Sequence, residues 1–143
     1  MTAEKYLEQI KKIDAIIINK LNDHKRWVEL ATGLGGFSVG ERVKSTPNLQ
    51  KGADAICRYI DIEGEIDELK KKRGEIINTI QQLPETEYKI IYKLYVDKKK
   101  NGDDYLLKEL PSVFDKSYGW VKMHKNKALR LVQAMLDENN GGV

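Results

Sequence analysis

The chain has 143 residues, of which 41% are hydrophobic and 33% charged, and it carries a formal net charge of +3. The hydrophobic share excludes a disordered chain, and the length allows one ordinary domain or a small domain with an extended helical element. The sequence has neither a signal-peptide pattern nor an apolar run long enough for a membrane span, so we expect a cytoplasmic protein that makes no membrane contact.

A first long helix is predicted over residues 2–31. Its apolar positions recur every three or four residues, which is typical of a helix with one buried stripe, and Lys20 interrupts that stripe. The stripe consists of Tyr6, Ile10, Ile13, Ile17, His24, Trp27 and Ala31, and it is widened by Leu7, Ile16, Leu21, Val28 and Leu30. The glycine-rich stretch 33–36 is expected to end the helix, with a loop at about residues 33–50.

The segment 37–51 contains glycine, proline and several hydroxyl or amide residues, which is typical of a loop. Arg42, Lys44 and Lys51 make it mildly basic. We interpret it as a solvated connector; the alternative is a loop that contacts phosphate groups or a partner.

A second long helix is predicted from about residue 49 to residue 83, and its apolar seam extends over more than three heptads. The seam consists of Tyr59, Ile62, Ile66, Leu69, Arg73, Ile76, Ile80 and Leu83. A seam this regular needs a partner helix. Either the first helix folds back on it as an antiparallel hairpin, or a second chain supplies the partner in a homodimer. Both arrangements can also occur together, because Ile56, Ile60 and Ile77 offer apolar surface off the seam. The basic run at 70–73 follows the acidic run at 63–68, which predicts a salt-bridged outer face.

Pro84 is expected to break the second helix and to open a third, because proline suits the first turn of a helix. Tyr88, Ile91, Tyr92 and Tyr95 give this third helix a buried side, and a turn at 98–102 ends it. We therefore predict two domains. Residues 1–83 form a helical hairpin or coiled coil for dimerisation or partner docking, and residues 84–143 form a compact helical domain.

Two further helices joined by a turn are predicted in the second domain. Asp103 or Asp104 is expected to cap a short helix that Pro111 helps to end at Leu110. Its buried positions are expected to be Leu106, Leu107 and Leu110, and the turn is expected to be plugged by Val113 and Phe114. Ser117 is then a good N-cap for a final helix whose buried side contains Val121, Ala128 and Val132.

The final helix carries Lys122, Lys125, Lys127 and Arg130 and no acidic residue before Leu136. A basic helix in second place after a turn is how many small proteins read the DNA major groove. The candidate DNA-binding residues are Lys116, Ser117, Tyr118, Lys122, Lys125 and Asn126. Lysines there can neutralise phosphates, while Tyr118 and Asn126 can reach base edges or backbone oxygens. The alternative is a solvated helix whose cations suit its C-terminal dipole.

Residues 80–136 resemble region 4 of bacterial sigma-70-type factors, a module that contacts promoter DNA through a helix-turn-helix. The matching stretches are IQQLPETEYKIIYKLY, LLKEL and SYGWVKMHKNKALRLV. With its long helical first half and the middle segment GERVKST, the whole chain resembles small phage proteins of Gram-positive hosts, the ArpU- and RinA-type late transcriptional regulators and their relatives. Two departures are a turn that is one residue longer and contains Pro111, and His124 at a position where an aliphatic core residue is common. We interpret His124 as a satisfied histidine at the seam.

Little in the sequence points to catalysis or to a bound cofactor. The single cysteine, Cys57, excludes an intramolecular disulfide, and two histidines 100 residues apart argue against a zinc site. The only faint carboxylate cluster is Asp103 and Asp104 beside Asp97. We expect an all-α, non-enzymatic regulator that binds double-stranded DNA in the bacterial host cytoplasm and contacts RNA polymerase or another partner through its first half. The alternative is a protein-interaction adaptor that does not bind DNA.

Overall fold

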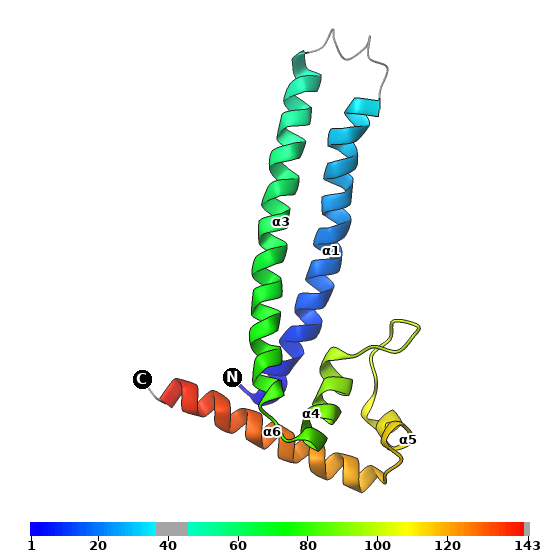
Figure 1. Cartoon of the computed structure of the whole chain (residues 1–143), viewed down its shortest axis with the longest axis vertical. Coiled ribbons are helices and arrows are strands. Elements are labelled where there is room, and N and C mark those ends of the chain that lie inside the picture. Colours follow the sequence, from blue (N-terminus) through cyan, green and yellow to red (C-terminus); the bar gives the residue numbers. More distant parts are fainter. Residues whose placement is uncertain (37–45, 142–143) are drawn as a thin grey trace. The chain divides into compact units, whose positions relative to one another are not determined.

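The computed structural model describes residues 1–36 and 46–141, and the side chains of residues 1–32 and 52–139. Regular structure in these residues is entirely helical, and the one β-bridge pairs Lys98 with Asp104. The elements are α1 (Ala3–Gly36), α3 (Thr46–Gln81), α4 (Glu85–Ile91), the π-helical turn η1 (Tyr92–Val96), the 3₁₀ turn η2 (Leu107–Glu109), α5 (Leu110–Phe114) and α6 (Tyr118–Gly141) (Figure 1). An all-α fold is therefore confirmed for the described part of the chain.

The contacts divide the chain into two compact units. The first, which we call the two-helix unit, is residues 13–71; the second, the α6 unit, combines residues 1–12 with residues 72–143. Neither limit coincides with the boundary expected at residue 83, because α1 begins and α3 ends within the α6 unit.

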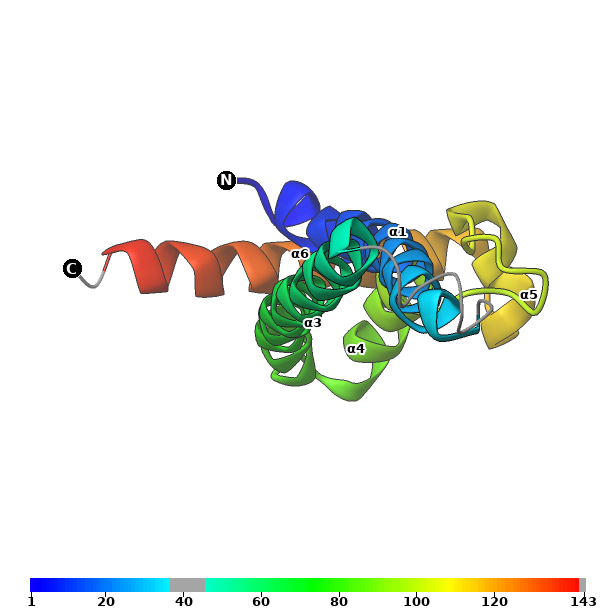
Figure 2. The same ribbon diagram turned by 90° about the horizontal axis from the view of Figure 1, so that it is seen from above.

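In the two-helix unit, α1 and α3 run antiparallel and side by side, which is visible along the helices and from above (Figures 1 and 2). Ile13 of α1 and Ala55, Ile62 and Ile66 of α3 are buried between them. In this part of the chain, buried residues of the α3 seam and of α1 lie on the two neighbouring helices.

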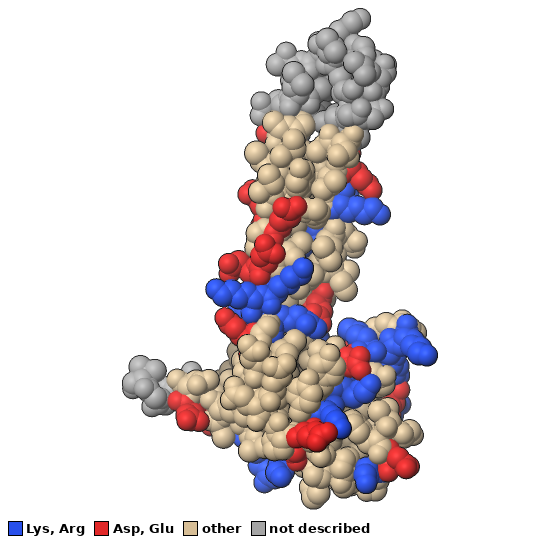
Figure 3. Space-filling view, viewed as in Figure 1, with Lys and Arg blue, Asp and Glu red and all other residues tan. Residues whose placement is uncertain are grey.

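Polar contacts also join the two helices. Lys20, the interruption of the α1 stripe, places its Nζ 2.7 Å from Glu65 Oε2, and Arg58 lies 3.7 Å from the other oxygen of Glu65. The hydrogen bond from Lys20 is the main reason why the pKa of Glu65 is lowered. His24 Nε2 lies 2.9 Å from Glu63 Oε1. Acidic and basic side chains lie next to one another along α3 (Figure 3), and these two carboxylates pair across to α1.

Both predicted helix ends beside the loop are wrong. Helix α1 continues through the glycines to Gly36, and α3 already begins at Thr46 with Pro47 in its first turn. Proline suits that position because a first-turn N–H has no intrahelical partner. The remainder of the expected loop, residues 37–45, lies outside the described residues.

The predicted widening of the α1 stripe is also wrong in part. Ile16, Leu21 and Leu30 are exposed, as are Ile56 and Ile60 on α3. One partner helix covers only a stripe about 100° wide, so apolar residues off that stripe stay in solvent.

The α6 unit has a core with contributions from every helix of the described chain. Its largest fully buried side chains are Leu7, Ile10, Ile80, Ile90, Ile91, Leu110, Val121 and Val132. Two hydrogen bonds tie the amino end of α1 into this unit. Tyr6 Oη lies 3.1 Å from Thr79 Oγ1 on α3, and the Ala3 N–H donates to Gln133 Oε1 on α6 at 2.8 Å. Elements from both ends of the chain therefore stabilise α6.

Pro84 separates α3 from α4, as predicted, and its carbonyl accepts from the Tyr88 N–H at 2.8 Å. The predicted third helix widens from α-helical into π-helical hydrogen bonding in η1, which the sequence pattern did not indicate, and the Asp97 N–H donates to the carbonyl of Tyr92, five residues earlier, at 2.8 Å. The turn at 98–102 is present, with Gly102 at a φ of +90°, a conformation that suits glycine.

Candidate nucleic-acid interface

Helix α5 begins at Leu110, the residue at which the predicted helix was expected to end. No helix runs from Asp103 to Leu110; η2 and then α5 occupy 107–114, and Pro111 lies in the first turn of α5 rather than ending a helix. The N–H of Leu106 donates to Glu109 Oε1 at 3.0 Å, so Glu109 caps this start instead of Asp103 or Asp104. Leu110 is fully buried as predicted, whereas Leu106 is 50% exposed.

The turn between α5 and α6 consists of Asp115, Lys116 and Ser117. Asp115 has a φ of 54°, a left-handed conformation that aspartate tolerates better than most side chains, and the Lys116 N–H returns to the Pro111 carbonyl at 3.0 Å. The Trp120 N–H donates to Ser117 Oγ at 3.1 Å, which confirms the predicted N-cap. Both views place α5 at the amino end of α6 (Figures 1 and 2).

One side of α6 packs against the core of its unit. Val121, Ala128 and Val132 are fully buried, as the spacing predicts. Phe114 is half-buried with its ring centroid 6.4 Å from that of Trp120, so it serves as the predicted plug of the turn. Val113, the other predicted plug residue, is exposed because α5 turns it away from this packing. The core contacts fix which face of α6 is left to solvent.

His124 forms a hydrogen bond with the carboxylate of Glu87, a pairing that was not predicted from the sequence. Its Nδ1 lies 2.7 Å from Oε1 of Glu87, a residue of α4 that is only 2% exposed, and Lys127 Nζ lies 3.6 Å from the same oxygen. Burial by itself raises the pKa of Glu87, but the hydrogen bond from His124, the Glu87 backbone N–H and the charges of Lys127 and His124 outweigh it, so the pKa is lowered. An ionised carboxylate only accepts, so Nδ1 carries the proton.

A signal for Glu87 is present in the sequence. Leu83, Glu87, Ile90 and Leu94 follow helical spacing, which places one carboxylate on an otherwise apolar face. A charge in that position needs a partner. Which residue supplies it depends on how α4 and α6 pack, and the helical spacing of α4 does not contain that information.

The outward face of α6 carries most of the candidate DNA-binding residues. Lys116, Ser117, Tyr118, Lys122 and Asn126 are all exposed and lie in the turn or the first turns of α6. Lys122, Asn126 and Arg130 follow one another at intervals of four and therefore form one row, which we call the α6 row. Within the described chain, Lys122 and Arg130 make no ion pair. Lys116 Nζ lies 5.5 Å from the centroid of the Trp120 ring, a contact that holds it beside the start of the helix.

Lys125 does not lie in this row. It is half-buried and lines a hollow together with Lys11 and Lys12 of α1, on another side of the helix. The structure therefore brings together five of the six candidate residues and places Lys125 elsewhere.

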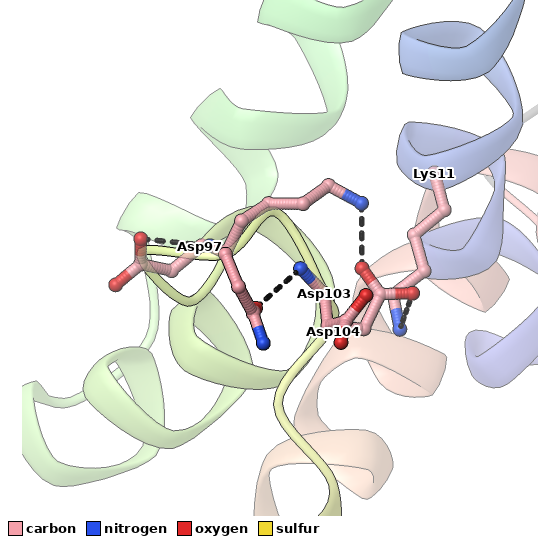
Figure 4. Close-up of polar contacts among 6 residues, drawn as sticks. Lys11, Asp97, Asp103 and Asp104 are labelled. Carbon is pink, nitrogen blue, oxygen red and sulfur yellow. Dashed lines mark hydrogen bonds and ion pairs between the residues drawn. The ribbon is translucent and has the colours of Figure 1, made fainter.

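The three aspartates of the loop after η1 do not form a carboxylate cluster (Figure 4). Asp97 Oδ2 binds Lys93 Nζ at 2.8 Å, and this hydrogen bond is the main reason why the pKa of Asp97 is lowered. Asp104 lies between Lys98 and Lys11, and the hydrogen bond from Lys98 is the main cause of its lowered pKa. The Asp103 N–H donates to Asn101 Oδ1 at 3.0 Å. Asp97 and Asp104 thus serve as lysine partners in this loop.

The predicted partner seam of α3 lies in the interior of the single chain. Ile62, Ile66, Ile76 and Ile80 are buried and Leu69 is half-buried. The surface open to a second chain is therefore the exposed apolar set on the two-helix unit, with Ile56 and Ile60 one helical turn apart.

In the part of the chain that the structure describes, His, Cys, Asp and Glu side chains form no group of three that could hold a metal ion. Among the same residues, none of the helices has both the length and the apolar character that crossing a bilayer requires. Comparisons of the chain with protein-family models, with curated proteins and with solved structures found no match.

Proposed function

We propose that the chain is a DNA-binding transcriptional regulator of phage or prophage genes, which reads double-stranded DNA with the amino-terminal half of α6. The observation that carries the proposal is the α6 row. Lys122, Asn126 and Arg130 face solvent on the helix whose opposite side is buried, directly after a turn with an N-cap at Ser117. A helix held from behind in this way can present its early residues to a major groove.

The chemistry of the row suits this role. Lys122 and Arg130 have no carboxylate partner among the described residues, so phosphate binding would displace no existing ion pair. Asn126 can form a bidentate contact with adenine, while Ser117 and the free N–H groups at the start of α6 suit a phosphate. The resemblance to region 4 of sigma-70-type factors supports the same assignment.

Binding of wild-type protein to fluorescent duplex DNA at low salt, measured by anisotropy, tests the proposal. Lys122→Glu is expected to weaken binding strongly, because it replaces an attraction to phosphate with a repulsion. Lys71→Glu is the matched control, since Lys71 is exposed in the two-helix unit. Absence of DNA binding by the wild-type chain would overturn the regulator assignment.

A second candidate function is that of a protein-interaction adaptor. Six large apolar side chains of the two-helix unit are exposed, namely Ile16, Ile18, Leu21, Leu30, Ile56 and Ile60. In the regulator, the same surface would join two copies as a homodimer or bind RNA polymerase. Sedimentation of the wild type and of Ile60→Glu distinguishes the homodimer from the other two cases. A homodimer becomes a monomer in the variant, whereas an adaptor or a polymerase contact leaves the mass unchanged.

A further inference from the structure

A hollow of about 380 Å³ opens in the α6 unit, away from the α6 row. Its walls come from the amino end of α1, from η1, from the segment that precedes and enters η2, and from α6. The lining residues are Glu8, Lys11, Lys12, Leu94, Tyr95, Tyr105, Leu106, Leu107 and Lys125. The volume lies within the range of sites that bind small molecules or peptide side chains.

Positive charge dominates the polar part of the hollow. Three lysines against the single carboxylate of Glu8 leave a local charge of +2. Lys11 is partly neutralised, because its Nζ lies 3.5 Å from Asp104 Oδ2 and 5.6 Å from the centroid of the Tyr95 ring. Lys12 and Lys125 have no ion-pair partner among the described residues, and Lys125 is half-buried. An ammonium group without a carboxylate partner can bind an anion without breaking an existing ion pair.

Three leucines, Leu94, Leu106 and Leu107, form the apolar part of the lining. Leu94 is buried, whereas Leu106 is half exposed at the edge of the hollow. Leu106 is not a loose loop residue, since its N–H is fixed by Glu109 Oε1 at 3.0 Å. Glu109 in turn forms an ion pair with Lys99. The hollow therefore offers a fixed leucine edge beside two unpaired ammonium groups.

Tyr95, another lining residue, has a phenol that is protonated at neutral pH. Burial, followed by the nearby charges of Glu4 and Glu8, raises the pKa of Tyr95 to about 12. The phenol therefore keeps its proton at neutral pH and adds no negative charge to the lining of the hollow.

We propose that this hollow binds a segment of a partner protein in which acidic and large apolar side chains alternate, with its carboxylates at Lys12 and Lys125 and its apolar side chains on Leu106 and Leu107. Charge complementarity favours an acidic segment. The leucine edge favours a peptide over a DNA phosphate, which would use the lysines alone. This site is independent of the DNA-binding role of the α6 row.

The test uses the full chain and a short fluorescein-labelled peptide of alternating Asp or Glu and Leu or Phe. The peptide is expected to bind to the wild-type chain. Lys12→Glu and Leu106→Ser are each expected to lower the affinity for the peptide about tenfold or more. Lys5→Glu and Val113→Ser are the matched controls. These residues are exposed to a similar degree in the same unit but outside the hollow, so their variants are expected to bind normally. Circular dichroism checks that each variant is folded.

Four results would overturn the proposal: no binding of the peptide, equal binding of a version with Ser in place of Leu and Phe, no effect of Lys12→Glu, or full displacement by inorganic phosphate. If the hollow bound DNA instead, Lys12→Glu would weaken the binding of duplex DNA as strongly as Lys122→Glu does. The Lys122→Glu variant is expected to bind DNA much more weakly and to bind the peptide as the wild type does. Failure of one site is therefore distinguishable from failure of the other.

Discussion

The two-helix unit and the α6 unit bury their apolar residues to very different extents. In the first, Ile18 is 57% and Ile60 53% exposed, whereas in the second Leu7, Ile10, Leu110 and Val121 are completely buried. Two helices alone can cover only the stripe between them, while the α6 unit surrounds its core with helices in several directions. The two-helix unit therefore exposes apolar surface that a partner could cover, whereas the core of the α6 unit holds α6 in place.

The largest expected effect comes from removing a core side chain of the α6 unit. Leu110→Ala leaves a cavity at the base of α5 and is expected to cost about 2–5 kcal/mol in the free energy of unfolding. Ile60→Ala in the two-helix unit is expected to change it by no more than about 0.5 kcal/mol, since that side chain is already half in solvent. Urea unfolding followed by circular dichroism measures both, and equal losses would contradict the difference between the units.

The buried carboxylate of α4 gives the next largest effect. Glu87→Gln is expected to cost about 1–3 kcal/mol at neutral pH, because it replaces the charged hydrogen bond between the buried Glu87 carboxylate and half-buried His124 with a weaker, neutral one. The folded-state pKa of Glu87 is lowered from 4.5, so its stabilisation is present above about pH 4.5 and is lost as the pH falls through the folded-state value.

Urea unfolding measures the free energy of unfolding of the wild type and of Glu87→Gln at pH 7 and at about pH 3. The difference between the two proteins is expected to be smaller at the lower pH. Other carboxylates with lowered pKa, such as Asp97 and Asp104, titrate in both proteins and cancel in this difference. A difference that stays constant with pH would show that Glu87 stabilises the unit by packing alone.

Ser117 gives a smaller effect at the start of α6. Ser117→Ala removes the acceptor for the Trp120 N–H and is expected to cost about 1 kcal/mol. Ser112→Ala is a suitable control, because Ser112 is exposed within α5 and is not an N-cap. Thermal unfolding followed by circular dichroism measures both variants, and similar losses would remove the N-cap explanation.

Periodicity predicted the features that depend on one helix at a time. The α3 seam and the buried face at Val121, Ala128 and Val132 follow directly from helical spacing, and the N-cap at Ser117 follows from residue type. The misplaced helix starts share one cause. Pro47 and Pro111 were interpreted as residues outside a helix, but both lie in the first turn of one, where proline is equally favoured.

Features that join distant segments could not be predicted in this way. The pairing of Glu87 with His124 and the gathering of Lys11, Lys12 and Lys125 around one hollow depend on how three helices pack. For the same reason Lys125 was grouped with Lys122 by charge. Helical spacing makes the two lysines neighbours, and only the packing of α1 against α6 places Lys125 in the lining of the hollow while Lys122 stays exposed.

The salt dependence of DNA binding tests the role of the α6 row most directly. For wild type, log K is expected to fall linearly with log salt, and Lys122→Ala is expected to reduce that slope by about 1, because one phosphate contact is lost. Lys125→Ala is expected to leave the slope unchanged, since Lys125 faces the hollow. A wild-type chain without salt-dependent DNA binding, or a slope that responds to Lys125 and not to Lys122, would contradict the assignment of α6 as the DNA-reading helix.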